Sequence, residues 1–274
     1  MKIATIARDI SHSPNMASND AAILECVANE LRARGFEVVD NYGATLPDDV
    51  VAVCHMSRSN EVLQKLKESD KQGIIVTNTP CAVENCSRLK MMQILQDANV
   101  AQPPFTPIEE HTQLNELHYP AWLKRANGWS CHKNDVCFVR DASEAMSAFR
   151  EMRSRGITEM IHCEHVAGDI IKFYGVEKKY FHYSYPDPEK SKFGLEKING
   201  TPHCYPFSIE KMKATVFAAA EKIGLEIYGG DCIVCKDGEI LIIDMNDFPS
   251  FTAVRDKAAK EIAEHITNRI NTKR

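Results

Sequence analysis

The chain has 274 residues, which at about 100–200 residues per domain is enough for two compact units. Its 33 Lys and Arg against 38 Asp and Glu leave a net charge of -5, and no run of five like charges occurs, which argues against a general nucleic-acid-binding protein. Hydrophobic residues make up 44% and charged residues 26%, close to the average of folded globular proteins, which excludes an intrinsically disordered chain.

The hydropathy of the chain predicts neither a signal peptide nor a membrane span. The apolar run at 2–7 is too short for a signal-peptide core, and no stretch approaches the ~18 apolar residues of a membrane span. We therefore expect a cytoplasmic protein whose ten cysteines are reduced. Cys232 and Cys235 are spaced like a metal or redox pair, but strand residues three apart point to opposite faces, so we favour buried, inert thiols.

The first 80 residues alternate short apolar runs with amphipathic stretches. Patterns typical of buried strands lie at 2–7, 36–39, 50–54 and 74–76, and helical patterns lie at 18–34 and 60–71. Strands and helices that alternate in this way favour a parallel sheet covered by helices. We therefore predict a small α/β domain at residues 1–80, which would bind the substrate.

The pattern changes in the second part of the chain. A helical pattern at 83–98 is followed by a proline-rich breaker at 102–107, and we take residues 81–107 as a helix and linker. The strands expected beyond it lie at 120–126, 136–140, 158–166, 169–185, 226–235 and 240–245, and the helices at 143–154, 209–223 and 253–271. Paired strands with helices on one side predict an antiparallel α+β region at 108–274. Residues 186–208 are expected to form a long surface loop, a candidate lid over the site.

One segment of this region predicts a β-hairpin. Asp237-Gly238 between two apolar runs is a strong signal for a two-residue type I′ turn. The pairs that such a turn predicts are Lys236 with Glu239, Ile233 with Ile242, and Asp231 with Asp244. Directly opposed side chains lie ~4.5–5.5 Å apart at Cβ, so the hairpin sets two carboxylates side by side.

These two carboxylates suggest a metal site. Like charges in an apolar hairpin are unfavourable unless a cation lies between them. Asn246 is two residues beyond Asp244, hence on the same face, and adds a third oxygen ligand. Three hard oxygen ligands suit Mg²⁺, which also binds phosphate oxygens. We therefore predict that Asp231, Asp244 and Asn246 bind Mg²⁺; the alternative is a hairpin end that is simply solvated.

Positive charge for a phosphate is expected at a second segment. A strand that ends near Lys124 is followed by a small-residue loop with Gly128 and Ser130. Backbone N–H groups of such a loop can contact a phosphate, with the lysine as a point charge. An ordinary hairpin with a surface lysine explains the same pattern. Lys172 lies inside an apolar strand, where a lysine usually has an anionic partner.

Taken in order, these features resemble the ATP-grasp superfamily. The resemblance covers about residues 74–255, and its most specific part is Asp244-Met245-Asn246-Asp247-Phe248-Pro249, similar to the acidic-x-Asn-x-x-Pro signature of that superfamily. It implies an N-terminal α/β domain followed by two α+β subdomains, at about 108–166 and 167–274, that clamp ATP. It also implies two Mg²⁺ ions, with Mn²⁺ as a substitute, held by the three oxygen ligands named above.

The resemblance further implies which residues contact ATP. These are Arg88, Lys124, Ser130, Cys163, Glu164, Val166 and Asp169. Arg88, Lys124 and Ser130 would contact phosphates, with Arg88 standing where many members carry a lysine. The 163–166 turn would hold the adenine through main-chain hydrogen bonds, and Asp169 would lie near the ribose.

The reaction implied by the resemblance is less specific. Most ATP-grasp members are ligases that phosphorylate a carboxylate and let an amine or thiol displace the acyl phosphate. They usually place an arginine near the transferring phosphoryl group, but residues 156–254 contain none. We therefore expect a lysine of that region to act there, Lys172, Lys178 or Lys179, or else an arginine from elsewhere, Arg255 or Arg8. We rank a ligase first. The alternatives are a kinase acting on a polyol or inositol phosphate, since the motif around Asp244 also resembles the inositol trisphosphate kinase branch, and a nucleotide-binding module without chemistry.

Substrate contacts are expected at the carboxyl edge of the N-terminal sheet, where α/β units usually bind ligands. Arg8 and Ser13 follow the first strand, and Arg58 follows the strand at 50–54. We predict that these side chains bind a substrate carboxylate or phosphate; a solvated loop is the alternative. The expected partners are ATP and a small-molecule substrate, without nucleic acid or membrane, and the sequence is compatible with a homodimer.

Overall fold

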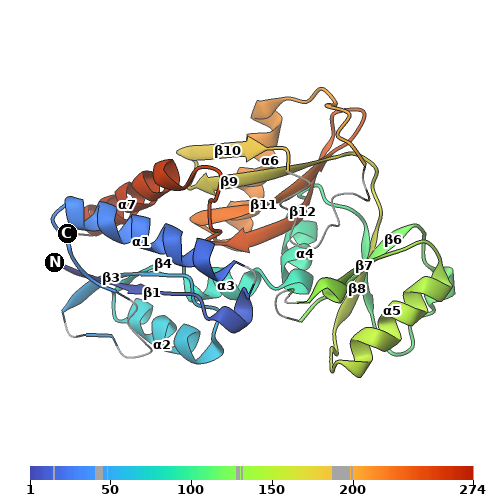
Figure 1. Cartoon of the computed structure of the whole chain (residues 1–274), viewed down its shortest axis with the longest axis horizontal. Helices are drawn as coiled ribbons and strands as arrows, with labels where there is room; N and C mark the ends of the chain where they lie inside the picture. The colour runs from blue at the N-terminus through green and yellow to red at the C-terminus, as the bar shows by residue number, and fades with distance from the viewer. Residues whose placement is uncertain are drawn as a thin grey trace.

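The described residues form three four-stranded sheets, one of them parallel and two antiparallel, arranged as in Figure 1. The computed structural model describes every residue except 15, 41–45, 48, 128, 129, 131, 187–197, 199 and 274. The mixed α/β and α+β class expected from the sequence is confirmed. In the described part of the chain, no helix is both long enough and apolar enough to cross a bilayer.

The N-terminal sheet is parallel, with strand order β2-β1-β3-β4. Its strands are β1 (Lys2–Ile6), β2 (Glu37–Val39), β3 (Val50–His55) and β4 (Ile75–Thr77), and the associated helices are α1 (Ala17–Ala33) and α2 (Asn60–Lys71). A short 3-10 turn, η1 (Ile10–His12), follows β1. Ile3 and Ala52 are fully buried, because both faces of a parallel sheet are covered.

The last helix returns to this N-terminal unit. α7 (Arg255–Thr272) lies beside α1 (Figure 1), and Ile262 and Ile266 of α7 share a buried core with Ile23 and Val27 of α1. The C-terminal end of the chain therefore helps to cover the parallel sheet. The domain limits at residues 80 and 107 stay a prediction.

The single helix expected at 83–98 is two helices. α3 (Pro80–Asn85) and α4 (Arg88–Asp97) are separated at Ser87, whose extended backbone (φ -61°, ψ 135°) interrupts the helical hydrogen bonds. The expected linker at 102–107 is also partly structured, because β5 (Phe105–Ile108) begins within it. β5 is an edge strand, which is where a proline such as Pro107 is tolerated.

The second sheet is antiparallel, with order β5-β8-β6-β7. It adds β6 (Ala121–Arg125), β7 (Val136–Val139) and β8 (Met160–Glu164), with α5 (Ala142–Ser154) packed on one face and short 3-10 turns η2 (Leu114–Glu116) and η3 (Lys133–Asp135). Leu123, Val139 and Met152 meet in the core under α5. The opposite face carries Lys124, by strand alternation.

The third sheet is antiparallel, with order β10-β9-β11-β12. Its strands are β9 (Asp169–Val176), β10 (Tyr180–Ser184), β11 (Ile227–Val234) and β12 (Ile240–Asp247), and α6 (Ile209–Ile223) packs on one face. The single strand expected at 169–185 is thus two strands, joined by a tight turn in which Glu177 has φ 51°. Most of the expected loop at 186–208 falls outside the described residues, so its use as a lid stays a prediction.

The hairpin between β11 and β12 differs from the predicted one in its turn. Cys235 N donates to Glu239 O, so the loop has three residues, and Gly238 (φ +81°) takes the left-handed position of such a loop. The predicted pairs of Lys236 with Glu239 and of Ile233 with Ile242 are therefore wrong.

A bulge further along the same hairpin restores the predicted register. Ile233 pairs with Leu241 and Cys232 with Ile242, but the register shifts between Cys232 and Asp231 and leaves Ile243 as the extra residue. Asp231 then faces Asp244, as predicted. The pairing of the two carboxylates is confirmed, although the turn proposed to produce it is not.

Candidate active site

Two adjacent rows of side chains cross the third sheet on the face opposite α6. The first row is Ser184, Lys172, Asp231 and Asp244, and the second row is His182, Tyr174, Gly229 and Asn246. Residues that alternate with them, such as Ile171, Phe173 and Cys232, point to the other face and pack with α6. The sheet register therefore brings together the three predicted metal ligands and Lys172.

The two carboxylates of the first row have few described partners. Lys172 Nζ lies 2.9 Å from Asp231 Oδ1, with side chains 34% and 24% exposed. Asn246 Nδ2 donates to Asp244 Oδ2 over 3.1 Å. Among the described residues, no hydrogen bond reaches Asp231 Oδ2 or Asp244 Oδ1. Two opposed carboxylates and the amide oxygen of Asn246 are hard oxygen donors on a half-exposed face, a set that fits Mg²⁺.

Lys124 lies on the second sheet with no described carboxylate within ion-pair distance. It pairs with Val136 on one side and Ile161 on the other. On the same face, two residues earlier, Trp122 Nε1 donates to His165 Nδ1 over 3.1 Å. An ammonium that lacks a described acidic partner is suited to an anionic ligand.

The turn after β8, predicted to hold adenine, is tied to the sheet by its main chain. Glu164 N donates to Pro104 O over 2.9 Å and His165 N to Pro120 O over 3.0 Å. Cys163 is buried, with its thiol against Met92 Sδ, so it can offer a ligand only main-chain atoms. The N–H of Val166 donates to no described residue, which leaves it available for the predicted adenine contact.

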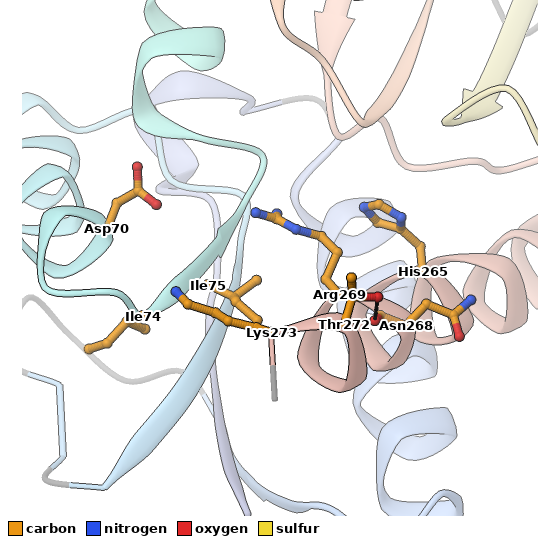
Figure 2. Close-up of a pocket in the computed structure, with 8 residues that line it drawn as sticks. All are labelled: Asp70, Ile74, Ile75, His265, Asn268, Arg269, Thr272 and Lys273. Atoms are coloured by element: carbon orange, nitrogen blue, oxygen red, sulfur yellow. Dashed lines mark hydrogen bonds between the residues drawn. The ribbon is translucent and has the colours of Figure 1, made fainter.

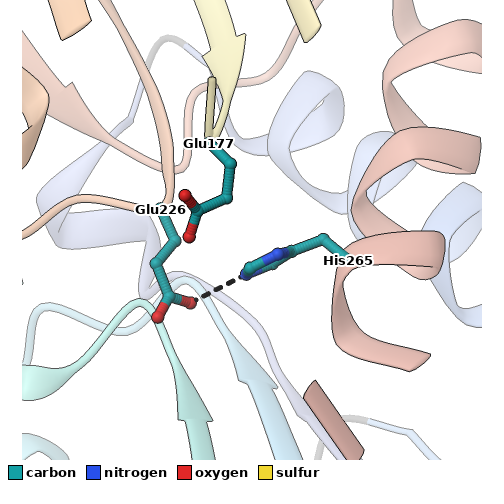
Figure 3. Close-up of side chains that lie close together, drawn as sticks. All are labelled: Glu177, Glu226 and His265. Atoms are coloured by element: carbon teal, nitrogen blue, oxygen red, sulfur yellow. Dashed lines mark hydrogen bonds and ion pairs between the residues drawn. The ribbon is translucent and has the colours of Figure 1, made fainter. Parts of the chain in front are cut away.

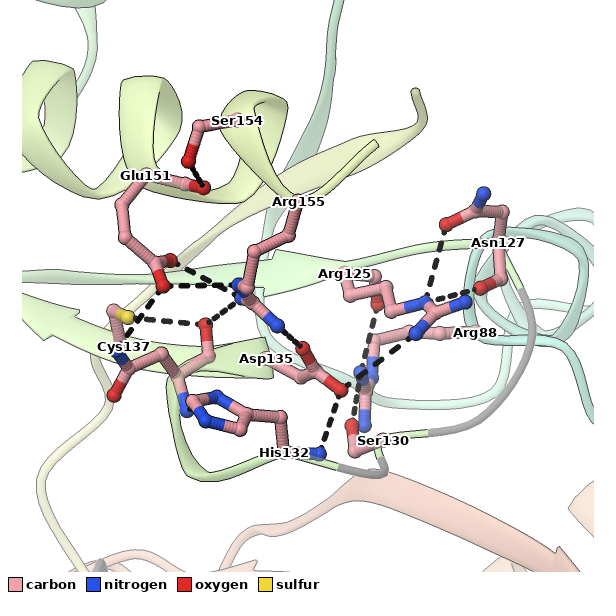
Figure 4. Close-up of polar contacts among 11 residues, drawn as sticks. Arg88, Arg125, Asn127, Ser130, His132, Asp135, Cys137, Glu151, Ser154 and Arg155 are labelled. Carbon is pink, nitrogen blue, oxygen red and sulfur yellow. Dashed lines mark hydrogen bonds and ion pairs between the residues drawn. The ribbon is translucent and has the colours of Figure 1, made fainter. Parts of the chain in front are cut away.

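Arg88 reaches from α4 to the loop after β6 (Figure 4). Its Nη1 donates to Arg125 O over 2.8 Å and to Ser130 Oγ over 3.2 Å. The far end of the loop is held by Asp135, which is fully buried and accepts from His132 N over 2.9 Å and from Arg155 Nη1 over 2.6 Å. Two predicted phosphate contacts, Arg88 and Ser130, are thus neighbours. Gly128 of the same loop lies outside the described residues.

Asp169 has partners other than the ribose expected for it. Its Oδ1 accepts from His203 N over 2.7 Å and its Oδ2 from Tyr205 N over 2.9 Å, and the side chain is 1% exposed. The carboxylate therefore anchors the 203–205 segment and is closed to a ligand in this structure. The sequence pattern at Gly168-Asp169 could not reveal partners more than thirty residues away.

Two of the three predicted substrate residues, Arg8 and Arg58, have side chains buried at the junction of the N-terminal unit and β12. Arg8 Nη2 donates to Asp247 Oδ2 over 3.2 Å and to the carbonyls of Asp247 and Phe248, and Arg58 Nε donates to Asp247 Oδ1 over 2.8 Å. Burial, reinforced by the charge of Arg58, lowers the pKa of Arg8 to about 10. Ser13 is also buried, beside Asp20, whose pKa is raised by burial. Substrate binding by these residues stays a prediction, because both guanidinium groups already bond to Asp247.

Sequence reasoning overlooked Asp247 as a structural residue. It follows Asn246, so strand alternation places it on the face opposite the two rows, where it is 1% exposed. A carboxylate expected on a buried face needs a cationic partner, which is the signal that was available in the sequence. Arg255, another expected phosphoryl contact, is the first residue of α7 and donates to Asn19 Oδ1 over 2.9 Å. Arg255 therefore belongs to the α1–α7 junction, whereas Lys172 lies in the first row.

A cavity and an acidic cluster of the described residues lie away from the two rows. A cavity of about 390 Å³ (Figure 2) lies between the end of α7 and β4, lined by residues that include Asp70, Arg269 and Lys273. Glu177, Glu226 and His265 gather nearby (Figure 3), where Glu226 Oε2 accepts from His265 Nε2 over 3.0 Å and from Arg269 Nη1 over 2.8 Å. The arginine makes this group an ion-pair network that joins α7 to the residue before β11.

Comparisons with known proteins identify the fold. No known family profile matches the sequence, and no curated protein matches it. A D-alanine–D-alanine ligase from Bacillus anthracis superimposes with a TM-score of 0.72 at 14% identity, over 100% of this chain and 98% of that one. The same enzyme complexed with ATP superimposes with a TM-score of 0.71 at 14% identity, over 100% of both chains.

A second kind of structure gives the same result. A RimK domain ATP-grasp protein from Sphaerobacter thermophilus has a TM-score of 0.68 at 17% identity, over 96% of this chain and 98% of that one. These similarities extend over nearly the whole of each chain, so they include the parallel sheet as well as the two antiparallel sheets. The chain therefore has the fold of the ATP-grasp superfamily.

Proposed function

We propose that the protein is an ATP- and Mg²⁺-dependent ligase that activates a small-molecule or peptide carboxylate and joins it to an amine or thiol. The observation that carries this proposal is the grouping of Lys172, Asp231, Asp244 and Asn246 on one open sheet face. Three of these offer oxygen ligands for a metal, and the fourth offers a cation for a phosphoryl group. Support comes from the fold, because the similar structures include a D-alanine–D-alanine ligase complexed with ATP.

In this reaction the carboxylate attacks the γ-phosphorus of ATP. The bond from that phosphorus to the β,γ-bridging oxygen breaks, which yields ADP and an acyl phosphate, and the amine or thiol then displaces inorganic phosphate. Asp231, Asp244 and Asn246 would hold Mg²⁺, which supplies charge neutralisation at the β- and γ-phosphates. Lys172, fixed by its ion pair with Asp231, would place a positive charge beside the transferring group.

An ATP-consumption assay with candidate carboxylates and amines distinguishes the possible activities. ADP release coupled to a new amide or thioester supports the ligase. A phosphorylated product would identify a kinase instead, and tight ATP binding without turnover under any condition would identify a nucleotide-binding module.

The metal ligands are tested by Asp244→Asn. We expect this change to abolish Mg²⁺-dependent ATP binding, measured by calorimetry with and without a chelator, while the fold persists. Glu239→Gln is the matched control, because it removes an exposed carboxylate from the same hairpin. Unchanged MgATP affinity in Asp244→Asn would rule out the metal assignment.

A further inference from the structure

The second row contains a tyrosine that no prediction from the sequence assigned. Tyr174 lies on β9 two residues after Lys172, between His182 on β10 and Gly229 on β11. Asn246 is the next residue across, paired with Gly229. Strand alternation therefore puts the phenol on the same face as the three metal-ligand candidates and one step from them.

The space that a side chain at position 229 would occupy is taken by the tyrosine ring and a proline. A Cβ on Gly229 would lie 2.7 Å from Pro249 Cγ and 2.9 Å from Tyr174 Cδ1, closer than real Cβ contacts. The ring of Tyr174 therefore lies against the bare backbone of β11, on the side towards Asn246. Position 229 must be glycine for this arrangement to exist.

Neighbouring aromatic groups hold the ring in place. The Phe251 centroid lies 5.3 Å from that of Tyr174, and the His182 ring stacks on it at 6.4 Å with an interplanar angle of 16°. Burial raises the pKa of Tyr174, and the charges of Lys172 and Asp231 act on it with opposite signs. The hydroxyl is therefore neutral at pH 7, keeps its proton to donate, and lies within electrostatic range of the first row.

The hydroxyl of Tyr174 donates to none of the described residues, in contrast to Tyr228 on the opposite face of the same sheet. Tyr228, on the α6 side, donates its hydroxyl to Glu177 O over 2.7 Å while its ring covers Gly175. The two tyrosines share the same ring-over-glycine packing and differ in whether the hydroxyl has a partner. Packing alone thus accounts for the ring of Tyr174 but not for its hydroxyl.

Charge that develops on a transferring phosphoryl group requires hydrogen-bond donors fixed in advance. No arginine occurs between residues 156 and 254, so none can project from either row. Lys172 is the one lysine of the two rows and is bonded to Asp231. Besides Lys172, the rows carry potential donors in Ser184, His182, Asn246 and Tyr174, and Tyr174 is the one whose ring packs against Phe251 and over Gly229.

We propose that Tyr174 is a catalytic residue whose hydroxyl donates a hydrogen bond to a non-bridging oxygen of the phosphoryl group as it moves from ADP to the acceptor. The phenol keeps its proton throughout, so the bonds broken and formed are those of the phosphoryl transfer alone. This proposal rests on the proposed function, because it needs ATP to bind with its γ-phosphate at the two rows.

The test compares the affinity for MgADP with that for MgADP plus aluminium fluoride, which mimics a phosphoryl group in transfer. We expect wild type to bind more tightly when aluminium fluoride is added. In Tyr174→Phe, the increase in affinity that aluminium fluoride produces should be about 100-fold smaller, the effect of removing one such donor. Affinity for MgADP alone and the melting temperature should stay unchanged. Phenylalanine keeps the ring over Gly229, so the packing is preserved.

Tyr228→Phe is the matched control, since it removes a tyrosine hydroxyl from the other face of the same sheet. It should leave the gain from aluminium fluoride intact and lower only the melting temperature. The proposal is overturned if Tyr174→Phe keeps the full gain, if it weakens MgADP equally, or if wild type gains nothing from aluminium fluoride. Failure of wild type to bind MgADP at all would instead overturn the proposed function.

Discussion

Two carboxylates, Asp244 and Asp247, lie on opposite faces of strand β12, and they differ in how fully neighbouring cations balance their charge. On one face, Asp244 belongs to the row of Lys172 and Asp231, whose side chains remain 34% and 24% exposed. On the other, Asp247 is 1% exposed and binds two guanidinium groups, Arg8 and Arg58, that are each 5% exposed. The first group keeps oxygen atoms for a ligand, whereas the second uses its charges to join the N-terminal unit to the third sheet.

Similar charges in one sheet thus serve separate purposes according to how deeply they are buried. A buried carboxylate with several donors gains little relative to an apolar group of the same shape, but loss of one partner leaves the others uncompensated. A half-exposed pair keeps much of its hydration and can exchange its partner for a metal or a phosphate. Measurements of stability should therefore separate the two faces.

The largest effect is expected for Asp247→Asn, which removes the carboxylate that both buried guanidinium groups share and leaves Arg8 only its longer ion pair with Asp20, at 3.8 Å. We expect a loss of about 3–5 kcal/mol in the free energy of unfolding, measured by urea denaturation. Asp244→Asn, three residues earlier, should change it by less than about 1 kcal/mol. A small loss in both variants would contradict the comparison, because it would mean that the junction does not depend on Asp247.

The junction also shows where prediction from sequence stops. The parallel sheet followed from local patterns, because short apolar runs and amphipathic helices alternate within 80 residues. The partners of Asp247 lie 239 and 189 residues away along the chain, at Arg8 and Arg58. No local pattern encodes such contacts, so both arginines were assigned to a ligand rather than to the protein's own carboxylate.

The metal-ligand hairpin was predicted for a reason that proved incomplete. Asp237-Gly238 correctly indicated a tight turn, but the turn has three residues and the bulge at Ile243 compensates for the extra one. A bulge depends on backbone hydrogen bonds that residue types do not specify. Asp231 and Asp244 could thus be placed together from sequence, whereas Tyr174 could not, because its role depends on the space left by Gly229 across the sheet.

A second expected effect concerns pH. His55 is buried beside the junction, with Nε2 2.8 Å from Asn78 O, and burial lowers its pKa below the ordinary value of 6.5. The unfolded chain therefore takes up a proton near pH 6.5 that the folded chain does not, so stability falls as the pH drops below that value. One such proton changes the free energy of unfolding by about 1.4 kcal/mol per pH unit.

Urea denaturation at several pH values tests this effect. His55→Gln keeps a donor for Asn78 O but does not titrate, so its stability should fall less steeply below pH 6.5 than that of wild type. His111→Gln, at an exposed loop position, is the control and should retain the wild-type slope. Equal slopes in all three proteins would show that His55 takes up a proton in the folded state as readily as in the unfolded one.

The smallest effect is expected at the first row, for Asp231→Asn. Its ion pair with Lys172 is half-exposed, and the change also removes a negative charge that faces Asp244. The lost attraction and the relieved repulsion oppose each other, so the free energy of unfolding should change by less than about 1 kcal/mol.

The combination of Asp231→Asn with Lys172→Met, measured at low and high salt, isolates the coupling energy between the two side chains. A coupling as large as the loss in Asp247→Asn would show that the first row stabilises the fold as the junction does. A small coupling that salt screens would mean that folding does not require this pair, as expected of two side chains whose proposed roles lie in ligand binding.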